Sequence, residues 1–154
     1  MSDHGLAKLQ RLVGAENGLC TLACVGSDGA PHTSVVNAGV MANPATGELS
    51  VATVVRSGAR KVRLMRADPR VVVTFRHSWD WMAVRGSAAL LGPDDPDSRF
   101  NPATLPDLLR EVFRAAGGTH DDWDTFDRVM AEERRLAVFV SMERLTDNGG
   151  STKP

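Results

Sequence analysis

Basic side chains crowd one short stretch of the sequence, RSGARKVRLMRADPR at positions 56–70, where Asp68 is the only acid. The cations are Arg56, Arg60, Lys61, Arg63, Arg66 and Arg70. The whole chain has a formal net charge of only −1, so this stretch is a local concentration of positive charge. A positive patch of this kind raises the local concentration of anions, which makes the stretch a candidate binding site.

A helix is expected to begin within this stretch. Ser57 and Gly58 are residue types that start helices, and Pro69 ends the run. Arg60 and Lys61 then fall in the first turn, at the positive end of the helix dipole, where each is unfavourable by about 0.3 to 1 kcal/mol. A bound anion reverses that sign, because free backbone N–H groups and two cations together form a phosphate site.

Two other interpretations of the basic stretch are open at this point. The cations could form a solvated helix face. Against this, Ala59, Val62 and Met65 form an apolar arc while Leu64 points away from it, which predicts burial on more than one side and a dimer contact. Nucleic-acid binding is disfavoured, because the pI is about 6.4 and no aromatic residues lie between the cations.

The other reactive residues form no catalytic constellation and no metal site. The four histidines lack metal-ligand spacing, and no nucleophile motif occurs. Cys20 and Cys24 lie four apart on an expected strand, about 13 Å from each other, so they are expected to be small buried residues that cannot bridge. Trp79 and Trp81 share one side of a strand and form either core or a ligand-stacking wall. If the protein is an enzyme, a cofactor should therefore supply the chemistry.

The elements that position these residues follow from the apolar pattern. Alternation predicts six strands, at two segments within 19–42 joined by the turn at 27–29, and at 49–55, 70–77, 79–92 and 135–142. Helical spacing predicts helices over 5–16, in the basic stretch, from 104 to 116 and over 121–133. The segments between strands hold too few helices for repeated βαβ crossovers. We therefore expect a mainly β (α+β) fold, a six-stranded antiparallel β-barrel with flanking helices.

Length and composition place the chain among ordinary globular proteins. Its 154 residues suit one domain, which we expect to cover 1–146 and to be followed by a disordered tail at 147–154. No window approaches the roughly 18 apolar residues of a membrane span. The first residues do not have the pattern of a secretory signal, so a cytoplasmic location is expected.

Three segments, in this order and spacing, resemble a known family. RKVRLMRADPRVVV resembles the basic helix, Asp-Pro-Arg and strand of the pyridoxamine 5'-phosphate oxidase-like, FMN-binding split barrels. WMAVRGSAAL and HDDWDTFDRVMAEERRLAVFV resemble the branch of that superfamily that uses the deazaflavin coenzyme F420. The resemblance runs from about residue 6 to 144. It implies a split β-barrel homodimer with the coenzyme at the subunit interface.

The resemblance also implies site residues. Lys61 falls where the family binds phosphate, with Arg60 beside it, and Arg56 and Ser57 line the same pocket. The coenzyme ring is then expected to lie among strand residues and two partner-subunit tryptophans. These are Thr53, Val54 and Val55 through their backbone, Ser34 and Val36 on the flanking strand, and Trp79 and Trp81 from the partner.

The function that follows is an oxidoreductase in which reduced coenzyme F420 transfers hydride to an unsaturated or conjugated small molecule. No catalytic residue is assigned; solvent or Arg56 is the candidate proton donor. The alternatives are an FMN-dependent enzyme of the pyridoxamine-phosphate-oxidase type and a non-catalytic protein that binds a flavin, a deazaflavin or haem.

Overall fold

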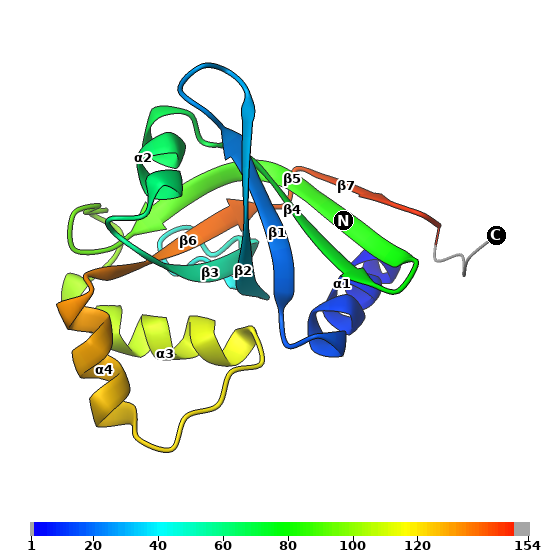
Figure 1. Cartoon of the computed structure of the whole chain (residues 1–154). Helices are drawn as coiled ribbons and strands as arrows, with labels where there is room; N and C mark the ends of the chain where they lie inside the picture. Colours follow the sequence, from blue (N-terminus) through cyan, green and yellow to red (C-terminus); the bar gives the residue numbers. More distant parts are fainter. Residues whose placement is uncertain (1, 150–154) are drawn as a thin grey trace.

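Six antiparallel strands close into a barrel that is flanked by four helices (Figure 1). The computed structural model describes residues 2–149. The elements in chain order are α1 (Asp3–Ala15), β1 (Leu19–Val25), β2 (Pro31–Ala42), β3 (Leu49–Arg56), α2 (Arg60–Ala67), β4 (Arg70–His77), β5 (Asp80–Leu91), the 3-10 turn η1 (Pro102–Thr104), α3 (Leu105–Ala115), α4 (Trp123–Glu132), β6 (Arg135–Ser141) and β7 (Arg144–Asp147). The predicted fold class is confirmed.

The barrel is made of two half-sheets that share two long strands. The strand order is β4-β1-β2-β3-β6-β5, and β5 pairs with β4 to close the ring. The first part of β2, up to Asn37, pairs with β1, whereas its second part, from Ala38, pairs with β3. In the same way β5 pairs first with β4 and then with β6. Each shared strand therefore passes from one half-sheet to the other.

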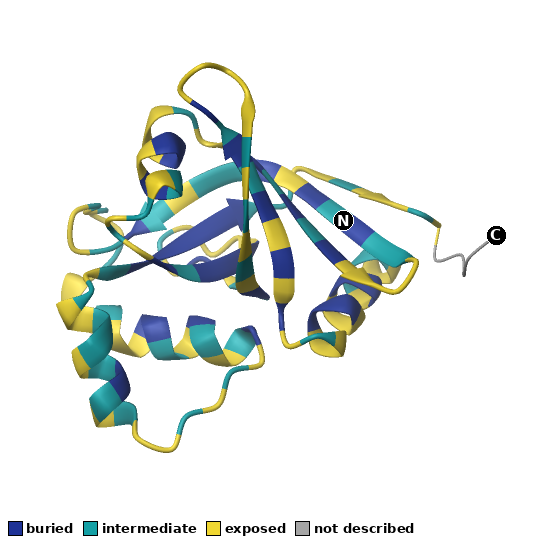
Figure 2. Cartoon of the chain, in the orientation of Figure 1, coloured by how far each residue is buried: buried dark blue, intermediate teal, exposed yellow. Residues whose placement is uncertain are grey.

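The hydrophobic residues form two cores, one inside the barrel and one outside it. Along β6, Leu136, Val138 and Val140 point into the barrel, whereas Ala137 and Phe139 pack under α3 and α4. Helices α3 and α4 thus cover one half-sheet, and the strands beneath them are buried on both faces (Figures 1 and 2). This explains why the sequence of β6 is continuously apolar instead of alternating.

The basic helix begins later than the sequence predicted. Residues Ser57 and Gly58 form the turn that follows β3, and the N-cap of α2 is Ala59, which offers no side-chain cap. The Ala59 N–H donates to the carbonyl of Arg56, and this turn takes up the residues that were expected to start the helix. The first helical residues are Arg60 and Lys61, so both cations stand at the very start of α2.

The apolar residues of α2 also differ from the expectation. Val62, Leu64 and Met65 are all buried in the core of the same chain. Leu64, which was expected to point away from the other two, therefore needs no partner subunit to cover it. The helix gives no argument for a dimer.

A short seventh strand, β7, was missed. It pairs with the first part of β5 and ends at Asp147, where the tail was expected to begin. Asn148 continues the ordered chain, since its side chain accepts a hydrogen bond from Lys8 and donates one to the carbonyl of Trp79. The remainder of the expected tail, 150–154, lies outside the described residues.

The cysteine prediction is confirmed: Cys20 and Cys24 are both buried and free. Burial raises the pKa of the Cys20 thiol to about 12, so it is not a nucleophile at neutral pH. None of the helices in the described part of the chain has the length and apolar character needed to span a membrane.

A buried lysine fastens α1 to the far end of the barrel. Lys8 is 7% exposed, and its Nζ lies 2.9 Å from Asp80 Oδ1 and 3.3 Å from Asp147 Oδ2. Arg11 also reaches Asp80, at 2.7 Å, but its side chain is 57% exposed. The hydrogen bonds from Lys8 and Arg11 hold the pKa of Asp80 below its ordinary value. Lys8 is therefore the central group of a network that joins α1, β5 and β7.

Replacing Lys8 with Met should lower the free energy of unfolding by about 1–3 kcal/mol, because two carboxylates lose a buried partner. Arg11→Ala is the matched control and should cost less than about 1 kcal/mol, since that pair is exposed. The Asp80 contribution is present above the ordinary Asp pKa of about 3.9 and is lost as the pH falls through its lowered folded value. Urea unfolding of both variants at pH 7 and pH 3 measures these stability losses. A loss of stability in Lys8→Met that is as large at pH 3 as at pH 7 contradicts the network.

Candidate functional site

An open cleft separates β2 from β3 on one side of the barrel. β3 pairs with β2 only as far as Thr53, where β2 turns away to β1, so the β3 edge from Val54 to Arg56 has no β2 partner. The opening leads into a cavity of about 720 Å³. Its strand wall is formed by residues from β2 and β3 and by the start of β6, namely Val35, Val36, Asn37, Val54, Val55, Arg56 and Arg135.

The point where β2 changes partners is held by hydrogen bonds. The Thr53 hydroxyl donates to the Asn37 carbonyl at 2.7 Å, and the Asn37 amide donates to the Asn17 carbonyl at 2.9 Å. The Ala38 N–H donates to the carbonyl of Gly18. These bonds fix where the two strands diverge, and they occupy the Thr53 hydroxyl.

Three cations line the cavity: Arg56, Lys61 and Arg135. Arg56 and Arg135 are directly opposite each other on neighbouring strands, and such like-charged pairs are unfavourable. Arg135 is neutralised by Glu133 at 2.7 Å, whereas Arg56 and Lys61 have no carboxylate partner within the described residues. The cavity therefore carries uncompensated positive charge.

Lys61 is held in place and is electrostatically strained. Its Nζ donates to the Ser34 hydroxyl at 3.0 Å, so a strand residue aims the ammonium group. Burial is the main cause that lowers the pKa of Lys61; Arg135 and Arg56 lower it further, and Cys24 opposes them. A bound anion would relieve this penalty, because it favours the charged form of the lysine.

The start of α2 supplies donors beside Lys61. The backbone N–H groups of Arg60 and Lys61 have no acceptor among the hydrogen bonds of the described chain, as expected for a first helical turn without a side-chain cap. Ala59, immediately before them, lines the cavity. The uncapped start of α2 therefore borders the cavity through Ala59 and Lys61. Unbonded amides at a helix start and a nearby cation are the groups that form an oxyanion site.

The structure brings together part of the predicted site. Val36, Val54, Val55, Arg56 and Lys61 line the cavity, and Ser34 is joined to it through Lys61. The other predicted residues do not line the cavity of a single chain: Thr53, Ser57, Arg60, Trp79 and Trp81.

The two tryptophans lie away from the cavity, in and next to the β4–β5 turn. Trp79 is 56% exposed in the turn and Trp81 is half-buried on β5. Their assigned role depends on a partner subunit and stays a prediction.

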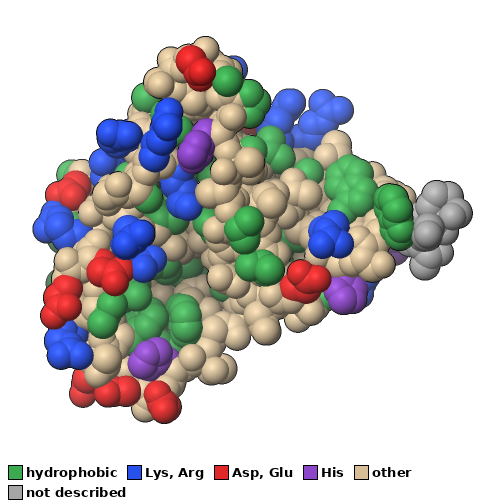
Figure 3. All heavy atoms as spheres, in the orientation of Figure 1, with side chains coloured by type: hydrophobic (Ala, Val, Ile, Leu, Met, Phe, Trp, Pro, Cys, Tyr) green, Lys and Arg blue, Asp and Glu red, His purple; other side chains and the backbone are tan. Residues whose placement is uncertain are grey.

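Sequence reasoning missed the α3–α4 side of the cavity. Phe113, Phe126 and Met130 line it, as do Val112, Ala116, Gly117, Gly118 and Thr119. Figure 3 shows hydrophobic side chains exposed over the α3–α4 region, with Lys and Arg side chains above them. Arg135 was also missed, although it stands at the start of β6, within one of the three segments on which the family resemblance rests. Among the described residues, no cluster of His, Cys, Asp and Glu could hold a metal ion.

An antiparallel barrel that opens between two of its strands belongs to the class of split-barrel proteins. The sequence matches pyridoxamine 5'-phosphate oxidase over residues 7–113, and the chain belongs to that family.

Solved structures agree on the fold at low sequence identity. A conserved hypothetical protein from Mycobacterium tuberculosis is 19% identical, with a TM-score of 0.65, and the match covers 96% of this chain and 84% of that one. A pyridoxamine 5'-phosphate oxidase-related, FMN-binding protein from Nostoc punctiforme is 14% identical, with a TM-score of 0.64 and coverage of 94% and 79%. A protein described as an F420 reductase is 15% identical, with a TM-score of 0.60 and coverage of 89% and 94%.

The cavity depends on how closely α3 approaches β2. A Cβ added at Gly39, on β2, would overlap the backbone carbonyl of Ala115 at the end of α3. Only glycine permits this contact without moving the helix. The helix end carries Ala116 and Gly117, which line the cavity. The spacing at Gly39 therefore sets the position of the helical wall.

Gly39→Ala should lower the free energy of unfolding by about 1–3 kcal/mol, because backbone atoms must move to admit the methyl group. Gly14→Ala in α1 is the control: no atom lies within 4 Å of its added Cβ, so this change should be neutral or stabilising by up to about 1 kcal/mol. Chemical denaturation compares the two. Equal stabilities of the two variants would show that α3 does not lie as close to β2 as described.

Proposed function

We propose that the protein is an oxidoreductase that uses reduced coenzyme F420 to transfer hydride to an unsaturated or conjugated small molecule. The observation that carries the proposal is the pair Arg56 and Lys61, two cavity cations without a carboxylate partner in the described chain, beside free amides at the start of α2. The residues fit a coenzyme with an anionic tail, since uncompensated charge and an open strand edge lie in one cavity and the uncapped start of α2 borders it.

The positive charge extends beyond a single phosphate pocket. Lys61 and Arg56 would hold a phosphodiester, while Arg60 and Arg63 are exposed on α2 without an ion pair in the described chain. FMN ends in one phosphate, whereas F420 continues from its phosphodiester into several carboxylates. Charge spread along α2 suits the longer tail. The preference for F420 over FMN rests on this spread of positive charge beyond the phosphate pocket.

The ring is expected to lie at the open edge of β3. Val54 and Val55 present backbone groups there that β2 leaves unpaired, and Val36 flanks them. When bound, the reduced coenzyme supplies a hydride from its C5 carbon to the substrate. The chain's own contribution is to orient the two reactants and exclude water.

No side chain is assigned as catalytic. Arg56 lines the cavity, but a guanidinium holds its proton too firmly to donate it at neutral pH. Solvent is the better proton source after hydride transfer.

We further propose a homodimer, supported by a sheet face that no helix covers. The outward residues of the half-sheet β2-β1-β4-β5 are exposed or half-buried, and Figure 1 shows no helix in front of them. One row runs across it through Val35, Thr21, Thr74 and Ala83 by direct cross-strand pairing. Val35 is 64% exposed and also lines the cavity, so this face and the coenzyme site are continuous. A second copy on this face could bring Trp79 and Trp81 to the partner's cavity.

The main alternative is an FMN-dependent enzyme of the same fold. It is favoured by the likeness to the Nostoc punctiforme protein, which is described as FMN binding. A non-catalytic carrier of either coenzyme would use the same cavity but would show no turnover. Titration with both coenzymes distinguishes the F420-dependent from the FMN-dependent enzyme. An assay of hydride transfer distinguishes either enzyme from a non-catalytic carrier.

F420 should bind in the low micromolar range or tighter, about −8 kcal/mol, and at least tenfold more tightly than FMN, a margin that shrinks as salt screens the tail. Lys61→Ala should weaken F420 binding by about 1.5–3 kcal/mol through loss of a charge-assisted hydrogen bond. Arg60→Ala should cost less, because its side chain does not line the cavity.

Fluorescence titration at low and high salt measures these affinities. Arg66→Ala is the matched control, because Arg66 lies on the same helix but is paired with Asp95 at 2.7 Å, away from the cavity. Equal or tighter FMN binding moves the assignment to the flavin enzymes. An unchanged affinity in Lys61→Ala, with the fold intact, removes the anion site.

Thr21→Glu should convert the dimer to a monomer of 16.6 kDa, because it places a charge at the centre of the uncovered sheet face without touching the cavity lining. Leu49→Glu, an exposed apolar position on β3 outside that face, should leave the dimer intact. Light scattering decides between the two states. A wild-type monomer at micromolar concentration contradicts both the dimer and the partner role of the tryptophans.

A further inference from the structure

The proposed coenzyme contacts leave one wall of the cavity unused. Phe113 from α3 and Phe126 and Met130 from α4 line it on the helical side, whereas the cations belong to β3, α2 and β6. The cavity thus has a cationic part and an apolar, aromatic part. An anionic coenzyme tail is drawn to the first and gains nothing from the second.

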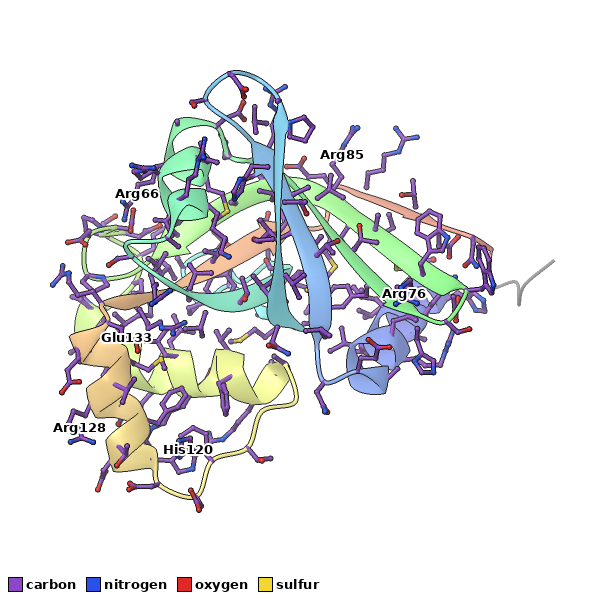
Figure 4. All side chains as sticks on the ribbon, in the orientation of Figure 1. Arg66, Arg76, Arg85, His120, Arg128 and Glu133 are labelled. Carbon is purple, nitrogen blue, oxygen red and sulfur yellow. The ribbon has the colours of Figure 1, made fainter. Side chains whose placement is uncertain are left out.

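The aromatic part belongs to a connected cluster of rings. Phe113 and Phe126 have centroids 5.0 Å apart, and Trp123 packs edge-on to Phe126 at 5.1 Å. His120, in the loop that joins α3 to α4 (Figure 4), has its ring centroid 5.7 Å from those of both Trp123 and Phe126. These spacings are those of favourable aromatic pairs. Only part of the cluster faces the cavity, and the rest supports it.

Several contacts fix the cluster before any ligand binds. Arg114 lies over the Trp123 ring at 4.4 Å from its centroid. His120 Nδ1 accepts a hydrogen bond from the Asp122 N–H at 3.0 Å, which orients the imidazole. A Cβ added at Gly118 would overlap the Phe113 ring, so the absence of a side chain there lets the ring occupy its position. The wall is preorganised, which lowers the entropy cost of binding a ligand against it.

We propose that Phe113, Phe126 and Met130 form the substrate wall and select flat, conjugated ring systems that are uncharged on the side facing α3 and α4. Ring faces and a thioether favour planar π-systems over saturated molecules of equal size. The substrate ring would lie between this wall and the open edge of β3, where the coenzyme ring is expected. The assignment of the bound molecule as the substrate rests on the proposed function, whereas the prediction that flat rings bind to this wall does not.

The test uses Trp123 as a local reporter. The chain has three tryptophans, so Trp79→Phe and Trp81→Phe together leave Trp123 as the only one. The probe is 2,3-dimethyl-1,4-naphthoquinone, a flat bicyclic quinone whose substituted carbons do not readily add a thiol. It should quench Trp123 saturably, and the saturated bicyclic ketone 1-decalone should fail to displace it. Efficient displacement by 1-decalone would overturn selection for flat rings.

Phe113→Leu in this background should weaken quinone binding about fivefold, which corresponds to the loss of one aromatic contact. Gly118→Ala should give a similar loss by displacing the Phe113 ring, and it remains informative if Phe113→Leu folds poorly. Phe100→Leu is the matched control, because Phe100 packs in the same outer core without lining the cavity. Equal affinities in Phe113→Leu, Gly118→Ala and Phe100→Leu would overturn the proposal.

Two further measurements separate this proposal from the proposed function. Saturating F420 should leave quinone binding in place; loss of the quinone would mean that the wall holds the coenzyme ring, which overturns the substrate role. Lys61→Ala should weaken F420 without changing quinone affinity. F420 affinity is measured on the chain with all three tryptophans, because Trp79 and Trp81 belong to the proposed coenzyme site. If F420 fails to bind that chain while the quinone still depends on Phe113, the coenzyme assignment fails and the aromatic site stands.

Discussion

The structure depends on β2 serving two half-sheets. A strand that pairs with β1 up to Asn37 and with β3 from Ala38 must leave β3 at that point, and the hydrogen bond from Thr53 to Asn37 marks the place. The open strand edge at the site follows from this divergence. It frees the edge of β3, opens the cavity, and leaves the first part of β2 exposed with Val35 at the rim. The barrel remains closed elsewhere, so the opening adds a cavity while the ring of strands stays intact.

The electrostatics of the opening run against the stability of the empty protein. Arg56 lies directly opposite Arg135 on the neighbouring strand. Lys61 is partly buried near both arginines and stands at the positive end of a helix dipole. Glu133, which Figure 4 labels at the C-terminal end of α4, neutralises Arg135. Perturbed charge gathered in a cavity is a feature of functional sites, and here its physical cause is a combination of burial and like-charge repulsion.

Much of the barrel could be predicted from the sequence, because alternation and turn residues are local signals. The cleft could not, since it depends on which strand each half of β2 pairs with, and that information is not local. Arg135 reaches the cavity only because β6 pairs with β3. Phe113 reaches it only because Gly39, which has no side chain, lets α3 approach β2 closely. The strand β7 has one half-buried apolar residue, Leu145, too little pattern to detect. The basic residues stand out in the sequence as a local run of charge, and their position at a helix start together with the family resemblance predicts an anion site, which stays a prediction.

The two cores explain how one small chain can hold a rigid barrel and a specific pocket. The inner core closes the ring of strands, and the outer core fastens α3 and α4 to one half-sheet through residues such as Phe139. The cavity lies where the outer core ends, so its aromatic wall is continuous with packed helices and its cationic wall with strands. Substitutions on the helices can therefore change the shape of the pocket without disturbing the divergence of β2 or the cations at the opening. This separation gives a physical reason why one fold can keep a cationic opening while the pocket beside it varies in shape.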